Sequence, residues 1–66
     1  MTWEELKEEA KKMRWIHYDA DIDCFYYNEL QFNKDGTLRI WDGFMYHILA
    51  EHRTPDQMLA IMKALQ

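Results

Sequence analysis

The sequence has little cysteine, glycine or proline: one cysteine, two glycines and one proline among 66 residues. A single cysteine cannot form a disulfide within the chain. Because glycine and proline are so scarce, tight turns are confined to a few positions, and no low-complexity linker or internal repeat is present. We therefore expect one domain over residues 1–66, stabilised by an apolar core without a covalent staple.

The chain also lacks a long apolar run and an excess of basic residues. A membrane-spanning helix needs about 20 apolar residues in succession, and no stretch approaches that length. Nonspecific nucleic-acid binding needs a basic surface, whereas eight Lys and Arg against twelve Asp and Glu give a net charge of −4. Residues 2–5 are Thr-Trp-Glu-Glu rather than a basic segment before an apolar core, so we expect no secretion signal. With the lone cysteine, these features predict a cytoplasmic protein without a membrane or nucleic-acid partner.

Aromatic residues, in contrast, are abundant: three Trp, four Tyr and three Phe. Large rings allow a short chain to fill a core from few positions. A domain of about 60 residues nevertheless buries only about 60% of the surface that its unfolded chain exposes. The aromatic residues can therefore exceed what one small core encloses.

Two segments carry the start signals of helices. Thr2 and Glu5 have the spacing of a capping box. Thr54 and Gln57 have the same spacing, with Pro55 at the first helical position. Apolar residues then recur at helical spacing: Trp3, Leu6, Ala10 and Met13, and later Met58, Ile61, Met62 and Leu65. Helices this short are unstable alone, so each must pack its apolar stripe on another element.

The stretch over residues 24–50 predicts two or three short strands joined by two Asp-Gly turns. Residues 26–32 alternate with period two, which is typical of a strand. A three-residue loop over residues 34–36 pairs Phe32 with Leu38, so that apolar residues face each other. A four-residue loop would mix the two faces of the sheet. We therefore predict the three-residue loop.

The second turn, at Asp42 and Gly43, allows two registers for a third strand over residues 44–50. A two-residue loop pairs Trp41 with Phe44 and turns the odd-numbered residues of that strand inward. A three-residue loop pairs Ile40 with Phe44 and turns the even-numbered residues inward. The first loop has the more common geometry, and the second buries more aromatic area. The sequence leaves this register open.

The predicted fold class is α+β, in the order α-β-β-(β)-α, a small antiparallel meander with both helices packed on one face. The segment Trp15–Tyr18 either extends the first helix or forms a short edge strand. No third helix is available for the outer face of the sheet. That face is either covered by residues 15–22, as by a lid, or is an interface.

We predict that the outer face is the interface. In the predicted register it carries Tyr27 and Arg39 together with an apolar set from the third strand. A twofold homodimer is the simplest way to cover it, because it needs no second gene product. The predicted contact residues are Trp41, Tyr46, Tyr27 and Arg39.

Three aspartates, Asp19, Asp21 and Asp23, match the opening of an EF-hand calcium loop. The match fails at the sixth position, where Cys24 replaces Gly, and at the twelfth, where Leu30 replaces Glu. A solvated turn, in which Asp side chains accept bonds from their own backbone, explains the spacing more simply.

The other possible metal ligands are His17, Cys24, His47 and His52. The spacing of His47 and His52 fits half of a zinc site, but no cysteine pair accompanies them. Cys24 has no orienting third group, so a small buried side chain is the expected role rather than a nucleophile. We therefore predict no catalytic residue, metal ligand or cofactor.

The function that the sequence favours is that of a small intracellular, non-enzymatic module that binds a protein partner or itself. One alternative is an acidic inhibitor or mimic of nucleic acid, which would use the Glu-rich first helix and residues 19–23. Another is a metal-binding domain that uses residues 19–23 or the histidines.

Overall fold

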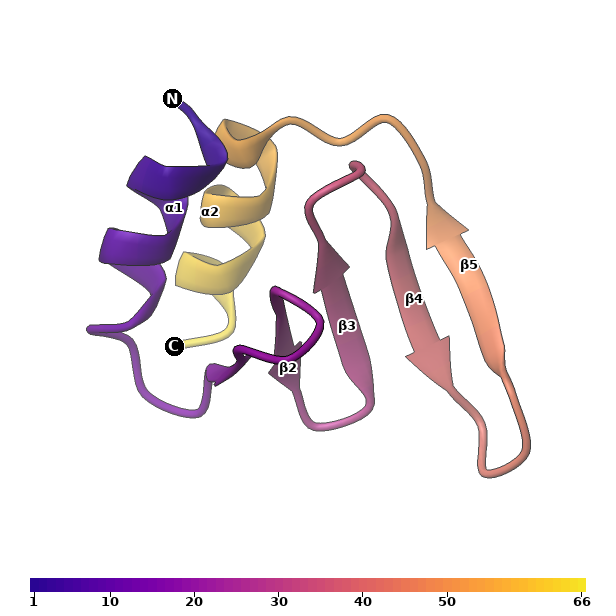
Figure 1. Cartoon of the computed structure of the whole chain (residues 1–66). Helices are drawn as coiled ribbons and strands as arrows, with labels where there is room; N and C mark the ends of the chain where they lie inside the picture. Colours follow the sequence, from indigo (N-terminus) through magenta and orange to yellow (C-terminus); the bar gives the residue numbers. More distant parts are fainter.

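Two helices and five strands form the fold in a computed structural model of residues 1–66 (Figure 1). Their order is α1 (Trp3–Ala10), β1 (His17–Asp19), β2 (Cys24–Tyr27), β3 (Leu30–Asn33), β4 (Leu38–Trp41), β5 (Tyr46–Ala50) and α2 (Pro55–Ala64). The strands make one antiparallel sheet in chain order, so the sheet is a meander. The predicted α+β class, with helices at both ends of the strand region, is confirmed.

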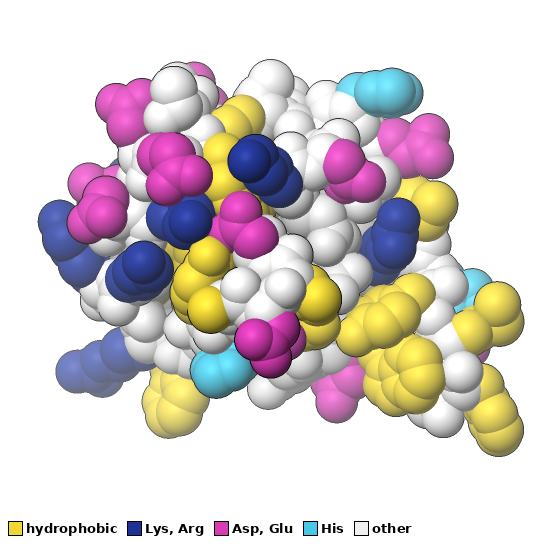
Figure 2. Space-filling view, viewed as in Figure 1, with side chains coloured by type: hydrophobic (Ala, Val, Ile, Leu, Met, Phe, Trp, Pro, Cys, Tyr) yellow, Lys and Arg dark blue, Asp and Glu magenta, His cyan; other side chains and the backbone are white.

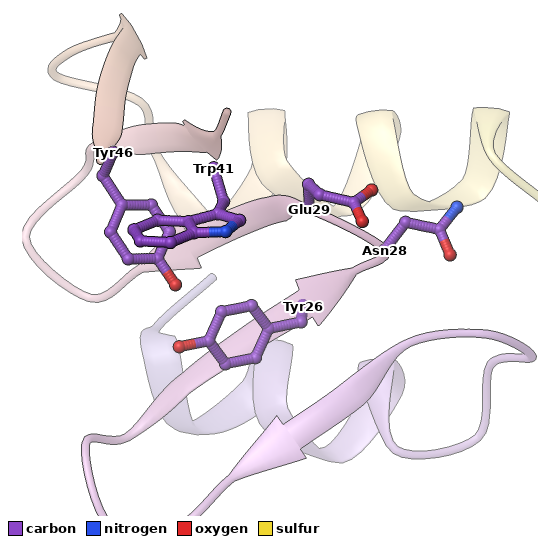
Figure 3. A pocket seen from close by; sticks show the side chains of 5 residues that line it. All are labelled: Tyr26, Asn28, Glu29, Trp41 and Tyr46. Atoms are coloured by element: carbon purple, nitrogen blue, oxygen red, sulfur yellow. The ribbon is translucent and has the colours of Figure 1, made fainter. Parts of the chain in front are cut away.

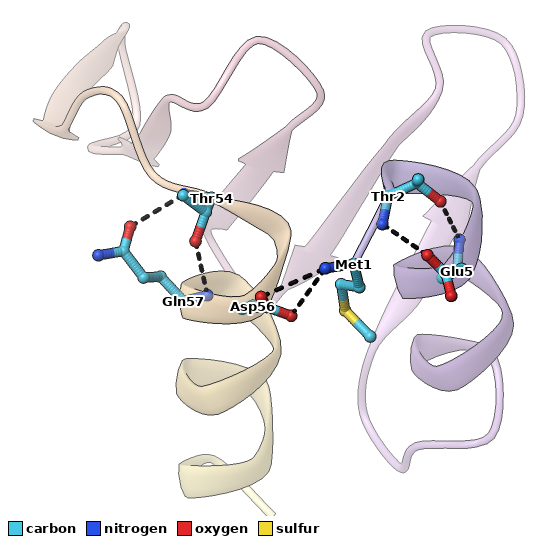
Figure 4. Close-up of polar contacts among 6 residues, drawn as sticks. All are labelled: Met1, Thr2, Glu5, Thr54, Asp56 and Gln57. Carbon is cyan, nitrogen blue, oxygen red and sulfur yellow. Dashed lines mark hydrogen bonds and ion pairs between the residues drawn. The ribbon is translucent and has the colours of Figure 1, made fainter.

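Both helices begin at the predicted capping boxes (Figure 4). The amide of Glu5 donates to Thr2 Oγ1 at 3.2 Å, and the amide of Thr2 donates to the Glu5 carboxylate at 2.8 Å. Thr54 and Gln57 exchange the same two bonds at 3.1 and 2.9 Å. Each box satisfies two amides that a helix start leaves without partners.

The helices lie side by side and run in the same direction (Figure 1). At their starts the Met1 amino group contacts Asp56 Oδ1 at 3.3 Å (Figure 4). At their ends the Arg14 amide donates to Gln66 Oε1 at 2.8 Å, and Gln66 Nε2 returns a bond to the Arg14 carbonyl. Neither helix has the length and apolarity to cross a bilayer.

The core lies between the helix pair and the nearer part of the sheet. Its buried members are Trp3, Leu6, Ala10, Phe25, Phe32, Leu38, Met58 and Met62. The sheet residues among them come from β2, β3 and β4, where Phe25 lies opposite Phe32 and Phe32 opposite Leu38. β5 supplies no buried residue, and only its last residue, Ala50, packs against the core. The helices therefore leave the β5 end of the sheet uncovered.

The first predicted hairpin is confirmed: Phe32 pairs with Leu38 and Leu30 with Ile40. The prediction of one continuous strand over residues 26–32 is wrong, because a turn at Asn28 divides this segment between β2 and β3. Asn28 has φ of 51°, a left-handed conformation that asparagine tolerates better than most residues. The turn also reverses the predicted sides of Tyr26 and Tyr27, so that Tyr26 faces outward.

The alternative in which residues 15–22 cover the outer face is wrong. Residues 17–19 form the edge strand β1, which pairs with β2 in the plane of the sheet. Trp15 and Ile22, the large apolar residues that a lid would turn inward, are 75% and 58% exposed. The edge-strand alternative for the segment after α1 is the one that the structure adopts.

Both predicted registers of the last hairpin are wrong, because Trp41 pairs with Tyr46. The Asp42 carboxylate explains the longer connection: it accepts the amides of Phe44 at 2.7 Å and Met45 at 2.9 Å. The bond from the Met45 amide, with those from the His47 side chain and the Phe44 amide, holds the pKa of Asp42 down at about 2. The observed pairing of Trp41 with Tyr46 is displaced by two residues from the predicted pairing of Trp41 with Phe44. A displacement of two residues leaves each side chain on the same face of the sheet, so Tyr46 lies on the outer face beside Trp41.

Candidate functional site

The hairpin formed by β4 and β5 exposes large apolar side chains on both faces of the sheet. We call β4, β5 and the turn between them the apolar hairpin, after its exposed residues Ile40, Trp41, Phe44, Met45, Tyr46, Ile48 and Leu49. Phe44, at the tip, is 91% exposed. Figure 2 shows apolar side chains gathered over this end of the molecule, whereas charged side chains of both signs lie over the helices. Contiguous exposed apolar surface on a small domain is typical of an interaction site.

The outer edge of β5 has backbone groups without partners in the sheet. The Trp41 amide donates to the Glu29 carbonyl at 3.0 Å, so Trp41 turns its backbone groups toward β3. Because these directions alternate along an antiparallel ladder, Ile40 turns toward β5 and bonds with its opposite residue, His47. Tyr46 and Ile48 therefore direct their N–H and C=O groups away from β4, into the open edge.

This edge carries little of the protection that edge strands usually have. Residues 43–50 include no Asp, Glu, Lys or Arg and no proline. A bulge does interrupt the ladder, since Arg39 pairs with Ile48 and Leu38 with Ala50, which leaves Leu49 without an opposite residue. The regular part of the edge, residues 46–48, is uncharged and open. Such an edge is a template for pairing with another strand.

The outer face beside this edge is hollowed (Figure 3). Tyr26, Asn28, Glu29, Trp41 and Tyr46 line a hollow of about 350 Å³. The rings of Trp41 and Tyr46 are in contact, with centroids 5.1 Å apart. The neighbouring Tyr46 hydroxyl and partial burial raise the pKa of the Tyr26 hydroxyl well above its usual range. We call this set of residues the aromatic hollow.

Of the predicted contact residues, the structure brings Trp41 and Tyr46 together on the outer face. Arg39 lies on the same face, opposite Gln31 and Ile48, and its buried Nε has no partner within the chain. The predicted position of Tyr27 is wrong: the Asn28 turn places it on the helix side, where it packs against the core. Tyr26, which the sequence reasoning did not select, occupies the outer position.

Asp23 is a structural residue that sequence reasoning missed. It has φ of 52°, and its carboxylate lies against α1. The carboxylate accepts from the Tyr18 hydroxyl at 2.6 Å and from Trp3 Nε1 at 3.2 Å, and lies 3.3 Å from Lys7 Nζ. The Tyr18 bond, with those from Trp3 and Lys7, lowers the pKa of Asp23 to about 2. Asp23 therefore joins the first helix to the β1–β2 turn.

The replacement Asp23→Asn is expected to destabilise the protein at neutral pH and to weaken its acid dependence. The folded pKa of Asp23, about 2, lies below the unfolded value of about 3.9. Its contribution is therefore complete above about pH 4 and is lost as the pH falls to about 2. Thermal melts of wild type and variant should differ at pH 7 and converge near pH 2. Asp21→Asn, at an exposed carboxylate in the same loop, is the control; an equal difference at both pH values would contradict this role.

The possible metal ligands do not converge. Nowhere in the chain do three His, Cys, Asp or Glu side chains lie close enough together to hold a metal ion. The expected turn is present at Asp19, whose carboxylate accepts the amide of Asp21 at 3.0 Å. Cys24 is 1% exposed, and burial raises the pKa of its thiol. The expected role of Cys24 as a small buried side chain is confirmed.

Comparison of the chain with protein-family models, with curated proteins and with solved structures gives no significant match.

Proposed function

We propose that this chain is a small non-enzymatic protein-interaction module that binds through the apolar hairpin, and that a second copy of the chain is its first partner. One observation carries the proposal: β5 joins an open, uncharged backbone edge to large apolar side chains on both of its faces. The edge supplies directional hydrogen bonds, and the side chains supply apolar area.

The free backbone groups define a register for two copies. An antiparallel pair of β5 strands with His47 at the twofold axis places Tyr46 of one copy opposite Ile48 of the other. Each of these residues would donate its N–H and accept with its C=O, because both groups point into the edge. The Leu49 bulge lies outside this pairing. The result is an isologous interface and one sheet continuous across both copies.

Charge does not oppose this arrangement. Residues 1–23 contain seven acids and four bases, so −3 of the net charge of −4 lies there. The paired edges carry no formal charge. Acidic and basic side chains are intermixed over the helices (Figure 2), and this distribution does not favour the acidic-mimic alternative. We therefore propose the interaction module and not the acidic mimic.

The replacement Ile48→Pro is expected to prevent association without unfolding the chain. Proline removes the outward N–H of Ile48, which the fold itself does not use, and edge strands tolerate proline. Ile48→Thr keeps the N–H and the β-branched shape, and is the matched control. Sedimentation velocity from micromolar to millimolar concentration should show dimers for wild type and Ile48→Thr. Ile48→Pro should remain monomeric, with an association at least about tenfold weaker, which is about 1.4 kcal/mol.

Two results would contradict the proposal. A wild-type chain that stays monomeric throughout this range would exclude self-association in solution. A folded Ile48→Pro variant that dimerises like wild type would exclude the β5 edge. Circular dichroism of each variant establishes that the fold is retained.

A further inference from the structure

The aromatic hollow combines an aromatic wall with a single acid. Trp41, Tyr46 and Tyr26 come from three different strands, and Glu29 comes from the β2–β3 turn. Figure 3 shows the Glu29 carboxylate to one side of the three rings. A hydrogen bond from the Trp41 amide to the Glu29 carbonyl joins the backbones of these two residues. This backbone bond fixes the end of the β2–β3 turn against β4 and so limits the separation of Glu29 and Trp41.

The electrostatics of the hollow favour a cation. Glu29 is the only charged residue in its lining, and no cationic side chain of the protein forms an ion pair with it. The faces of Trp and Tyr rings carry negative potential and attract cations. Carboxylate and rings thus act in the same direction on one bound group.

We infer that the aromatic hollow binds a guanidinium group, such as the end of an arginine side chain. Its lining includes three hydrogen-bond acceptors: the Glu29 carboxylate, the Asn28 amide oxygen and the Tyr46 hydroxyl. A guanidinium is planar, stacks on aromatic faces and presents N–H groups that match a carboxylate in pairs. A quaternary ammonium would leave these acceptors unused.

The size of the hollow agrees with such a group. At about 350 Å³ it lies near the lower end of the range of ligand pockets, which is about 300–1,000 Å³. A side-chain end fits this space better than a drug-sized ligand. The site is separate from the β5 edge, because the ring of Tyr46 lines the hollow whereas its backbone groups face the edge. Guanidinium binding therefore does not depend on self-association.

The test is a titration of the full chain with N-acetyl-arginine amide, followed by backbone amide NMR and Trp fluorescence. N-acetyl-citrulline amide has the same shape without the charge, and tetramethylammonium has the charge without N–H donors. Free arginine, compared with the capped compound, separates a metabolite ligand from a side chain on a protein. We expect saturable shifts at Asn28, Glu29 and Trp41 with the capped arginine, and binding at least fivefold weaker with citrulline and tetramethylammonium.

Variants locate the binding. Glu29→Gln should weaken capped arginine at least fivefold, and Trp41→Leu should do the same through the lost ring. Glu51→Gln removes an equal charge from an exposed connection outside the hollow and should have no effect. The inference is overturned by equal binding of arginine and citrulline, by unchanged binding in Glu29→Gln, or by shifts that do not map to the hollow.

Discussion

Replacing Phe32 by alanine is expected to remove most of the stability of this domain. Phe32 is 0% exposed and lies at the centre of the core, between Phe25 and Leu38. Truncating a buried Phe costs about 3–5 kcal/mol through lost apolar burial and the cavity left behind. Small domains have a total stability near the lower end of about 5–15 kcal/mol. The variant should be largely unfolded or melt far below wild type.

The matched control is Phe44→Ala, the same replacement at a ring that is 91% exposed. Exposed substitutions change stability by only about 0.5 kcal/mol. Urea unfolding of the three proteins, followed by circular dichroism, gives both differences. Because association would add stability, the comparison belongs at a low and equal protein concentration. Equal losses for the two variants would place the core elsewhere.

Gly36→Ala is expected to cost more than the same change at Gly43, although both glycines have positive φ, 93° and 103°. A Cβ at Gly36 would lie 3.1 Å from the carbonyl oxygen of Arg53 and 3.2 Å from its nitrogen. These backbone atoms cannot yield freely, since the Arg53 amide donates to the Gly36 carbonyl at 2.9 Å. A Cβ at Gly43 would meet nothing within 4 Å.

The expected losses follow from these surroundings. Positive φ alone costs a residue with a Cβ about 1–2 kcal/mol, and overpacking adds about 1–3 kcal/mol. Gly43→Ala should therefore lose only the first amount, and Gly36→Ala both. Thermal melts of the two variants beside wild type measure the difference. Equal melting temperatures would mean that the connection before α2 does not press on Gly36.

The sequence predicted the features whose causes are local. The capping boxes at Thr2 and Thr54 involve residues three positions apart, so spacing alone locates the helix starts. The register of the first long hairpin followed from matching Phe32 to Leu38 across a short loop. Such features need no knowledge of the rest of the fold.

The features that the sequence did not predict depend on side chains that reach across the structure or redirect the chain. The Asn28 turn has no glycine, and a continuous alternation hid it. The last hairpin is set by the Asp42 carboxylate, which competes with the backbone for the amides of the turn. Asp23 acquires its role from Trp3 and Tyr18, which only the tertiary fold brings near it.

The predicted interface also combines features with local causes and features that depend on the rest of the fold. Outward-facing rings of Trp41 and Tyr46 belonged to one of the two registers that the sequence left open, because facing follows parity along a strand only once the register is known. The wrong side of Tyr27 follows from the missed turn. The open edge of β5 could not be predicted, since the direction of each backbone group depends on the register, which the sequence left open.

Amide hydrogen exchange of residues 46–48, measured at several protein concentrations, tests most directly whether the β5 edge associates. The amide of His47 pairs with β4 within one chain and should exchange slowly at every concentration. The amides of Tyr46 and Ile48 should exchange rapidly in dilute protein. They should slow by at least about tenfold as association becomes complete, because each then donates to the second copy. Rapid exchange of Tyr46 and Ile48 at all concentrations would contradict edge pairing.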